Sequence, residues 1–146
     1  MTEIDFHFNA PDKVGHTCRL LRKAVVGRGA RLVVTGSAQV LEAIDAALWQ
    51  LAPSDFVAHC RVDGQAHVAQ RSPVLLTDAP SAVPPQQRPV LVNLGDEVPA
   101  GFERFDRLIE IVTGEEADRQ AARRRWRHYA DRGYAIRRHD LAGERG

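Results

Sequence analysis

Hydrophobic side chains near the N-terminus follow first the period of a strand and then that of a helix. Within residues 2–8 the apolar side chains Ile4, Phe6 and Phe8 alternate with polar ones, as in a strand with one buried face. Residues 12–28 then carry an apolar side chain every three or four positions, which predicts an amphipathic helix. Asn9 is a candidate cap for this helix, and Gly27 and Gly29 are candidates for its end.

The same order repeats along the next part of the chain. Residues 31–35 form a β-branched run that predicts a strand, and Ser37 follows as the cap of a helix that reaches about Gln50. Further short strands are predicted over residues 56–60, 74–77, 90–94 and 108–112, with a turn or short helix over 102–105. Strands that alternate with helices predict an α/β fold with an open, mainly parallel sheet flanked by helices.

Length and proline content indicate the domain organisation. A chain of 146 residues, 44% of them hydrophobic, is long enough for one core, so we expect residues 1–146 to form a single domain. Four prolines between residues 78 and 89 predict a surface loop of extended character. We expect a flexible tail from about residue 140.

The segment from Glu115 to Gly133 predicts a last helix, with an acidic opening, an arginine-rich body and a glycine stop. At helical spacing, Ala122, Trp126 and Tyr129 share one stripe, and Arg119, Arg123 and Arg127 run along its flank. One interpretation is that the aromatic rings are core and the arginines a solvated face. The other is a binding site, because arginine is suited to forked recognition of carboxylate or phosphate.

Overall charge restricts the kind of partner. The net charge is only +1, which excludes a polycationic coat for duplex DNA. Basic residues instead gather between positions 119 and 138, which predicts a local site. No charged leader precedes an apolar core, and no apolar run reaches membrane-spanning length. We therefore expect a cytoplasmic protein without a membrane partner.

Side chains that could support catalysis or metal binding are scattered: His7, His16, Cys18, His59, Cys60 and His67. Their spacings match no common metal-ligand pattern, and no nucleophile elbow is present in the sequence. Two cysteines do not make a disulfide framework, and we expect each to be a small buried side chain. The sequence also lacks a glycine-rich phosphate-binding loop. We expect no catalytic residue, metal or cofactor.

Three segments, taken in order, resemble the chi subunit of bacterial DNA polymerase III. They are LEAIDAALWQLAPSDFVAH (41–59), RPVLVNLGDEVP (88–99) and RQAARRRWRHYADRGYAI (119–136). In that family a helix ending in LDxALW, a short P-x-x-F-x-P-H link and a closing R-x-R-[YW]-x-x-Y-x-x-x-G-[YF] helix recur in this order. The resemblance spans essentially the whole chain and implies an open α/β sheet of nucleotide-binding-like topology without a phosphate-binding loop.

The resemblance implies a non-catalytic adaptor of the replicative polymerase holoenzyme in the bacterial replisome. Members of the family bind the psi subunit of the clamp-loader complex and the acidic C-terminal tail of single-stranded DNA-binding protein, so they meet DNA indirectly. The tail-binding positions correspond to Arg119, Arg123, Trp126, Arg127, Gly133 and Tyr134 in this sequence, and the psi-facing positions to Trp49 and Phe56.

The implied roles agree with the chemistry of an acidic peptide that ends in an aromatic residue. Arg119 and Arg123 would pair with its carboxylates, and Trp126 would form one wall of a slot for the last ring. Gly133 would either leave room for close approach or simply end the helix. Trp49 and Phe56 would be either interface residues or partly buried packing residues.

One alternative assigns the arginine-rich helix to direct binding of single-stranded nucleic acid, because basic residues and aromatic rings are interleaved along it. Such binding would weaken steeply with salt, whereas the adaptor hypothesis predicts little binding without the partner protein.

Overall fold

The computed structural model describes residues 2–50, 59–61, 73–82 and 89–142. The strands within these ranges are β1 (Glu3–Ala10), β2 (Leu32–Thr35), β3 (His59–Arg61), β4 (Val74–Leu76), β5 (Val90–Asn93), β6 (Arg107–Thr113) and β7 (Ile136–Asp140). The helices are α1 (Lys13–Arg28), α2 (Ala38–Trp49), η1 (Pro80–Ala82), η3 (Phe102–Arg104) and α4 (Glu116–Asp131). The predicted alternation of strands and helices is confirmed.

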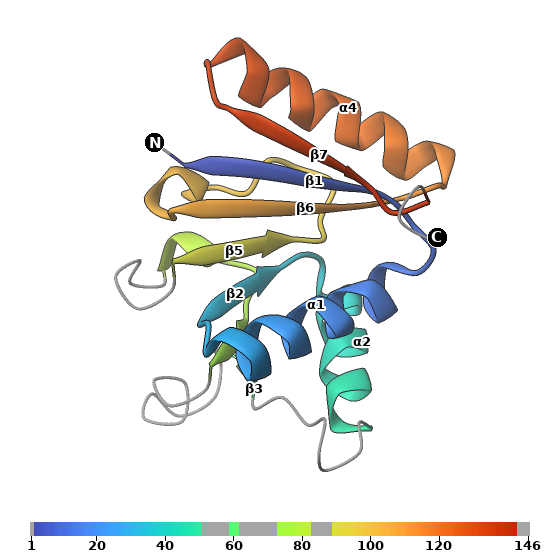
Figure 1. Cartoon of the computed structure of the whole chain (residues 1–146), viewed down its shortest axis with the longest axis vertical. Helices are drawn as coiled ribbons and strands as arrows, with labels where there is room; N and C mark the ends of the chain where they lie inside the picture. The colour runs from blue at the N-terminus through green and yellow to red at the C-terminus, as the bar shows by residue number, and fades with distance from the viewer. Residues whose placement is uncertain (1, 51–58, 62–72, 83–88, 143–146) are drawn as a thin grey trace.

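The strands form one sheet in the order β3-β4-β2-β5-β6-β1-β7. Every paired strand is parallel to its neighbour. The connection from β1 through α1 to β2 runs toward the β3 edge of the sheet, whereas the connection from β6 through α4 to β7 runs toward the β7 edge. Because both crossovers are right-handed, this difference in direction places α1 and α4 on opposite faces of the sheet. Figure 1 shows α4 beside β7 at one end of the molecule and α1 with α2 at the other. The prediction of an open parallel α/β sheet is confirmed.

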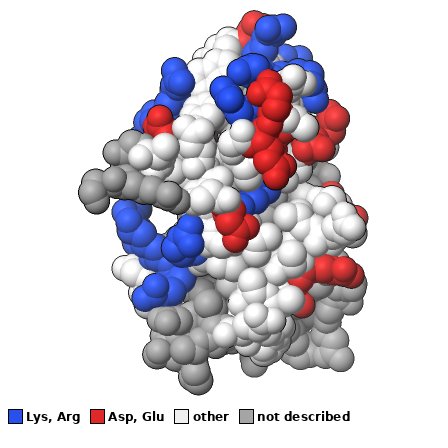
Figure 2. All heavy atoms as spheres, turned by 90° about the vertical axis from the view of Figure 1, so that its right-hand side faces the viewer, with Lys and Arg blue, Asp and Glu red and all other residues white. Residues whose placement is uncertain are grey.

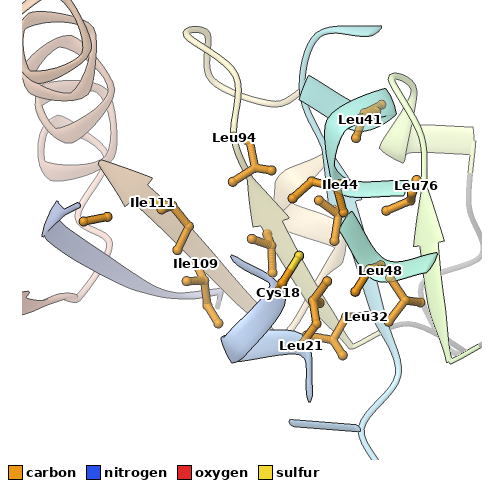
Figure 3. Close-up of a cluster of buried hydrophobic side chains, with 14 residues drawn as sticks. Cys18, Leu21, Leu32, Leu41, Ile44, Leu48, Leu76, Leu94, Ile109 and Ile111 are labelled. Carbon is orange, nitrogen blue, oxygen red and sulfur yellow. The ribbon is translucent and has the colours of Figure 1, made fainter. Parts of the chain in front are cut away.

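Each face of the sheet carries its own apolar core. On the face covered by α1 and α2, Cys18 and Leu21 meet Ile44 and Leu48 over strand residues such as Leu32, as Figure 3 shows. Cys18 is buried, as expected, and burial raises the pKa of its thiol. The opposite core contains residues of β1, β6, η3 and α4, including Ile4, Phe6, Leu108, Phe102 and Tyr129.

The boundaries on either side of α1 differ from the sequence prediction. Asn9 does not cap α1: its φ of 59° is left-handed, and its Nδ2 donates to Asp140 Oδ1 at 2.9 Å. The strand continues to Ala10, and Asp12 caps the helix instead by accepting a hydrogen bond from Gly15 N at 3.1 Å. Gly27 lies inside the helix, whereas Gly29, with a φ of 63°, ends it.

The last strand was not predicted from the sequence. β7 pairs in parallel with β1 along the sheet edge, and only Ile136 among its five residues is apolar. The other four side chains are charged or polar, a common feature of edge strands. β7 ends at Asp140, and Leu141 N still donates to Phe8 O at 3.0 Å. The remainder of the expected tail, 143–146, lies outside the described residues, as do residues 83–88 of the proline-rich loop.

A buried carboxylate joins α4 to the sheet. Glu110 of β6 is 0% exposed, and its Oε1 accepts hydrogen bonds from Arg125 Nε at 3.0 Å and Asn93 Nδ2 at 2.9 Å. Its Oε2 accepts a hydrogen bond from the Tyr129 hydroxyl at 2.6 Å. Arg125 is buried as well, and its Nη1 donates to Asp96 O at 3.0 Å. Burial raises the pKa of Glu110, and the Arg125 charge and the three hydrogen bonds oppose that rise.

The face of β1 and β7 on the α1 side is polar. The register pairs Asp5 with Arg137 and His7 with His139. His7 Nδ1 lies 3.1 Å from Nε2 of His16 on α1, and the His7 ring centroid is 4.9 Å from that of His139. Three histidines from three elements therefore meet beside α1.

Substitution of Arg125 by alanine is expected to destabilise the fold by about 3–5 kcal/mol, because it leaves the Glu110 carboxylate buried without its counter-charge. Arg124, the next residue, is exposed, so Arg124→Ala should change stability by less than about 0.5 kcal/mol. Urea unfolding of both variants measures the difference. Equal stability of the two variants would contradict a structural role for the buried pair.

Protonation of His7 is expected to weaken the fold in mild acid. Burial is the largest cause of lowering the pKa of His7 from 6.5 to about 4, and the charges of His16, His139 and Arg107 add to it while Asp5 opposes them. Between these two pH values the unfolded chain binds a proton that the folded chain does not, so stability falls as pH falls from 6.5 toward 4. Urea unfolding across this range should show a smaller loss for His7→Gln than for wild type. An unchanged slope in His7→Gln would refute the assignment.

Candidate partner-binding site

The start of α4 is fixed to the end of β6. Asp118 accepts hydrogen bonds from Thr113 N at 2.8 Å and Thr113 Oγ1 at 3.0 Å, and it pairs with Lys13 Nζ at 3.0 Å. Burial acts to raise the pKa of Asp118, but the bonds from Thr113 and Lys13 outweigh it and hold the pKa below its ordinary value. The first turn of α4 is thereby held to β6 and to the first residue of α1.

The end of α4 is a paired C-terminal cap. Gly133 has a φ of 80°, and its N–H donates to Ala130 O at 3.1 Å. Tyr134 N donates to Tyr129 O at 3.1 Å, and the two tyrosine rings lie 6.4 Å apart. This pattern of two bonds and one apolar contact is the Schellman motif, in which glycine takes the left-handed position. A Cβ on Gly133 would meet no atom within 4 Å, so backbone conformation explains this glycine and steric crowding does not.

Between these two ends, one flank of α4 faces β7. At 100° per residue, Arg119, Arg123 and Trp126 lie within about 60° of one another around the helix. The Trp126 ring is partly buried, with its centroid 5.0 Å from that of Phe6 and 6.1 Å from that of Phe8. The indole therefore presents its remaining surface beside two arginines of its own helix.

A further arginine completes this surface from the edge strand. The Arg138 guanidinium of β7 lies 5.3 Å from the centroid of the Phe8 ring and 5.8 Å from that of Trp126. A cation over an aromatic ring at this distance is attracted by the ring quadrupole. We call the surface formed by Phe8, Arg119, Arg123, Trp126 and Arg138 the α4–β7 surface.

The arginines of this surface are held loosely. Arg119 and Arg123 each lie 3.8 Å from a carboxylate oxygen of Glu116, and their side chains are 48% and 61% exposed. Exposed ion pairs of this kind contribute little to stability and exchange readily for other anions. Figure 2 shows Lys and Arg beside Asp and Glu over the top of the molecule, where α4 lies. Arg127 is exposed as well, and no ion pair involves it within the described part of the chain.

The structure brings together some of the predicted site residues and separates others. Arg119, Arg123 and Trp126 share the flank that faces β7, with Arg127 next to them on the outer side of the helix. Tyr134 instead packs on Phe102, with ring centroids 5.3 Å apart, beyond the end of the helix.

The predicted psi-facing pair is described only in part. Trp49, the last residue of α2, is 64% exposed, one of the most exposed large hydrophobic side chains in the described structure. Its ring centroid lies 5.2 Å from that of His59, whose Nε2 contacts Asp45 Oδ1 at 2.9 Å. Phe56 lies outside the described residues.

Sequence reasoning missed two kinds of residue. Arg125 was indistinguishable from its neighbours in a run of arginines, although its position, four before Tyr129, places it on the buried stripe. Arg138 and Phe8 were not assigned to the site because β7 was not predicted, and the strand is what carries Arg138 to the rings.

The histidines and cysteines do not form a metal site within the described ranges. No three His, Cys, Asp or Glu side chains there are arranged to hold an ion. His67 and the side chain of Cys60 fall outside those ranges.

No helix of the described chain is long and apolar enough to cross a membrane.

Comparison with known proteins gives a consistent result. A family model described as "DNA polymerase III chi subunit, HolC" matches residues 1–137. The DNA polymerase III subunit chi of Pseudomonas aeruginosa is 32% identical over 146 aligned residues, which cover 97% of this chain and 98% of that protein. The resemblance inferred from the three ordered sequence segments is therefore confirmed, and this chain belongs to the DNA polymerase III chi subunit family.

Proposed function

We propose that this protein is an adaptor of the bacterial replisome that binds the acidic C-terminal tail of single-stranded DNA-binding protein through its α4–β7 surface. Family membership makes the chain an accessory subunit of DNA polymerase III, not its catalytic part. The observation that carries the proposal is the partly exposed Trp126 ring, with Arg138 over it and Arg119 and Arg123 on the same flank.

This surface suits a peptide that is acidic and ends in an aromatic residue. The exposed Arg119 and Arg123 can release Glu116 and form forked hydrogen bonds with peptide carboxylates. The terminal ring of the peptide can pack against Trp126 and the edge of Phe8, which already form an aromatic cluster. Arg138 lies where it can pair with the terminal carboxylate. Charge supplies the orientation and the rings supply the apolar contact.

A second contact completes the adaptor. We propose that the exposed Trp49 at the end of α2 lies in the surface that meets the psi subunit of the clamp loader. Large exposed aromatic side chains are typical anchors of protein interfaces. α2 and α4 cover opposite faces of the sheet, so both partners can bind at once. Two micromolar contacts, each on the order of 8 kcal/mol, reinforce each other when held in one assembly.

The rival assignment, direct binding of nucleic acid by α4, is less well supported. Glu116 lies within ion-pair distance of Arg119 and Arg123, and Arg125 is directed inward to Glu110. The outward charge of the helix is therefore smaller than its sequence suggests.

We place the protein in the bacterial cytoplasm with the replisome, since both proposed partners act there.

Replacement of Trp126 or Arg123 by alanine is expected to weaken binding of a fluorescent peptide, matching the last ten or so residues of the cognate single-stranded DNA-binding protein, by about tenfold or more. Trp126→Ala removes the apolar contact, and Arg123→Ala removes a carboxylate partner. Added salt should weaken wild-type binding, because exposed charge pairs are screened. Fluorescence anisotropy measures the affinities, and thermal melting verifies that each variant is folded.

Arg124→Ala is the matched control, since Arg124 is also exposed on α4 but lines a pocket near the start of α1, away from the α4–β7 surface. It should bind the peptide within about twofold of wild type. Tight binding by a folded Arg123→Ala, Trp126→Ala double variant would rule out this location, and equal binding of a scrambled peptide would rule out sequence recognition.

A further inference from the structure

A second basic region lies on the opposite face of the sheet from α4. It is a groove of about 530 Å³ between α1 and the exposed half of the sheet. Its lining includes Arg19, Lys23 and Arg28 of α1, Arg107 of β6, Asp5 of β1, and Arg137 and His139 of β7. Polar side chains of β1, β6 and β7 form one wall of this groove, and α1, whose His16 reaches His7 of β1 at 3.1 Å, forms the other.

The sheet wall of the groove is close to neutral. The carboxylate of Asp5, with its side chain 6% exposed, contacts Arg137 Nε at 2.9 Å and Arg107 Nε at 3.2 Å. Glu3 lies 3.4 Å from Arg137 and 3.6 Å from Arg107. Two acids therefore balance two arginines, which fixes the guanidinium groups in place and leaves little net charge on this wall.

The wall of the groove formed by α1 carries the excess positive charge. Arg19, Lys23 and Arg28 are exposed, and no carboxylate within the described residues forms an ion pair with any of them. The helical rise separates Arg19 from Lys23 by about 6 Å and Lys23 from Arg28 by about 7.5 Å along the axis. Figure 2 shows a compact group of Lys and Arg at the height of α1, apart from the group over α4.

The spacing and the lining favour a phosphodiester chain over other anions. Arg19 and Lys23 lie within about 40° of each other around α1, and Arg28 lines the same groove from the last turn of the helix. Cations spaced along a groove in this way match a ligand whose charges repeat along its length. The rings of His7, His16 and His139 line the same groove and offer flat surfaces against which bases can pack. The chain also belongs to a family of DNA polymerase subunits, so nucleic acid is a ligand class that its assembly handles.

We propose that the groove between α1 and β7 binds the backbone of single-stranded DNA, with Arg19, Lys23 and Arg28 as its phosphate contacts. The site is separate from the α4–β7 surface, which lies on the other face of the sheet. The protein can therefore hold the peptide tail and a short stretch of strand at once. Binding is electrostatic, independent of sequence and sensitive to salt.

Anisotropy titration of the full-length protein with a fluorescent oligothymidylate of about 20 nucleotides tests this site, since single-strand sites span roughly 4–16 nucleotides per domain. An Arg19→Ala, Lys23→Ala double variant is expected to bind about tenfold more weakly at low salt. Loss of two phosphate contacts should also reduce the slope of log affinity against log salt by about 1.4. Lys23→Arg should retain affinity, and the acidic tail peptide should bind the double variant as it binds wild type.

The charge-matched control is an Arg119→Ala, Arg127→Ala double variant of α4, which should bind the oligonucleotide like wild type. Circular dichroism melting verifies that both double variants are folded. The proposal is overturned if wild type does not bind the oligonucleotide at low salt, or if the α1 variant binds it as tightly as wild type. It is also overturned if the α4 variant loses as much affinity, or if the α1 substitutions weaken the peptide and spare the oligonucleotide.

Discussion

The buried carboxylate of Glu110 determines how α4 sits on the sheet. A charge removed from water requires an opposite charge and further hydrogen bonds, which Arg125, Tyr129 and Asn93 supply. Because Arg125 and Tyr129 are one turn apart on α4, both can reach a single glutamate only when the helix is rotated with that stripe inward. This rotation turns Trp126 toward β7 and leaves the outer arginines exposed. The buried pair thus selects which part of an arginine-rich helix becomes a binding surface.

The two faces of the sheet differ because β1 alternates between apolar and polar side chains. Ile4 and Phe6 point to the core under α4, whereas Asp5 and His7 point to the α1 side, where the register brings β7 residues next to them. One face therefore supports an aromatic surface edged by arginines, and the other a groove lined by histidines and cations. A single edge strand, β7, contributes to both, with Arg138 on the first and Arg137 on the second.

Much of the fold could be predicted from periodicity, because most strands and helices carry one apolar face. The Ser37 cap, the Gly29 and Gly133 stops and the order of elements follow from local chemistry. β7 could not be predicted in this way, since an edge strand with charged residues has no apolar period. Only the pairing of β7 with β1 shows that Arg137 and Arg138 point to opposite faces of the sheet.

The sequence predicted on which helix the candidate site lies, but not which residues form it. The helical wheel placed Arg119, Arg123 and Trp126 on neighbouring positions, and the structure keeps them on one flank. Sequence alone could not show that Arg125 is committed to Glu110, because that pairing joins residues of different elements. Nor could it show that Tyr134 packs beyond the helix end, on Phe102.

Mapping of backbone and indole NMR signals on the isotope-labelled protein, during titration with the acidic tail peptide, tests the central claim most directly. We predict that the signals of Trp126, Arg138 and the flank of α4 shift in a saturable way, while those of α1 and α2 stay in place. Peptide-induced shifts confined to α1 or α2, with the Trp126 indole signal unmoved, would contradict the assignment of the α4–β7 surface as the tail-binding site.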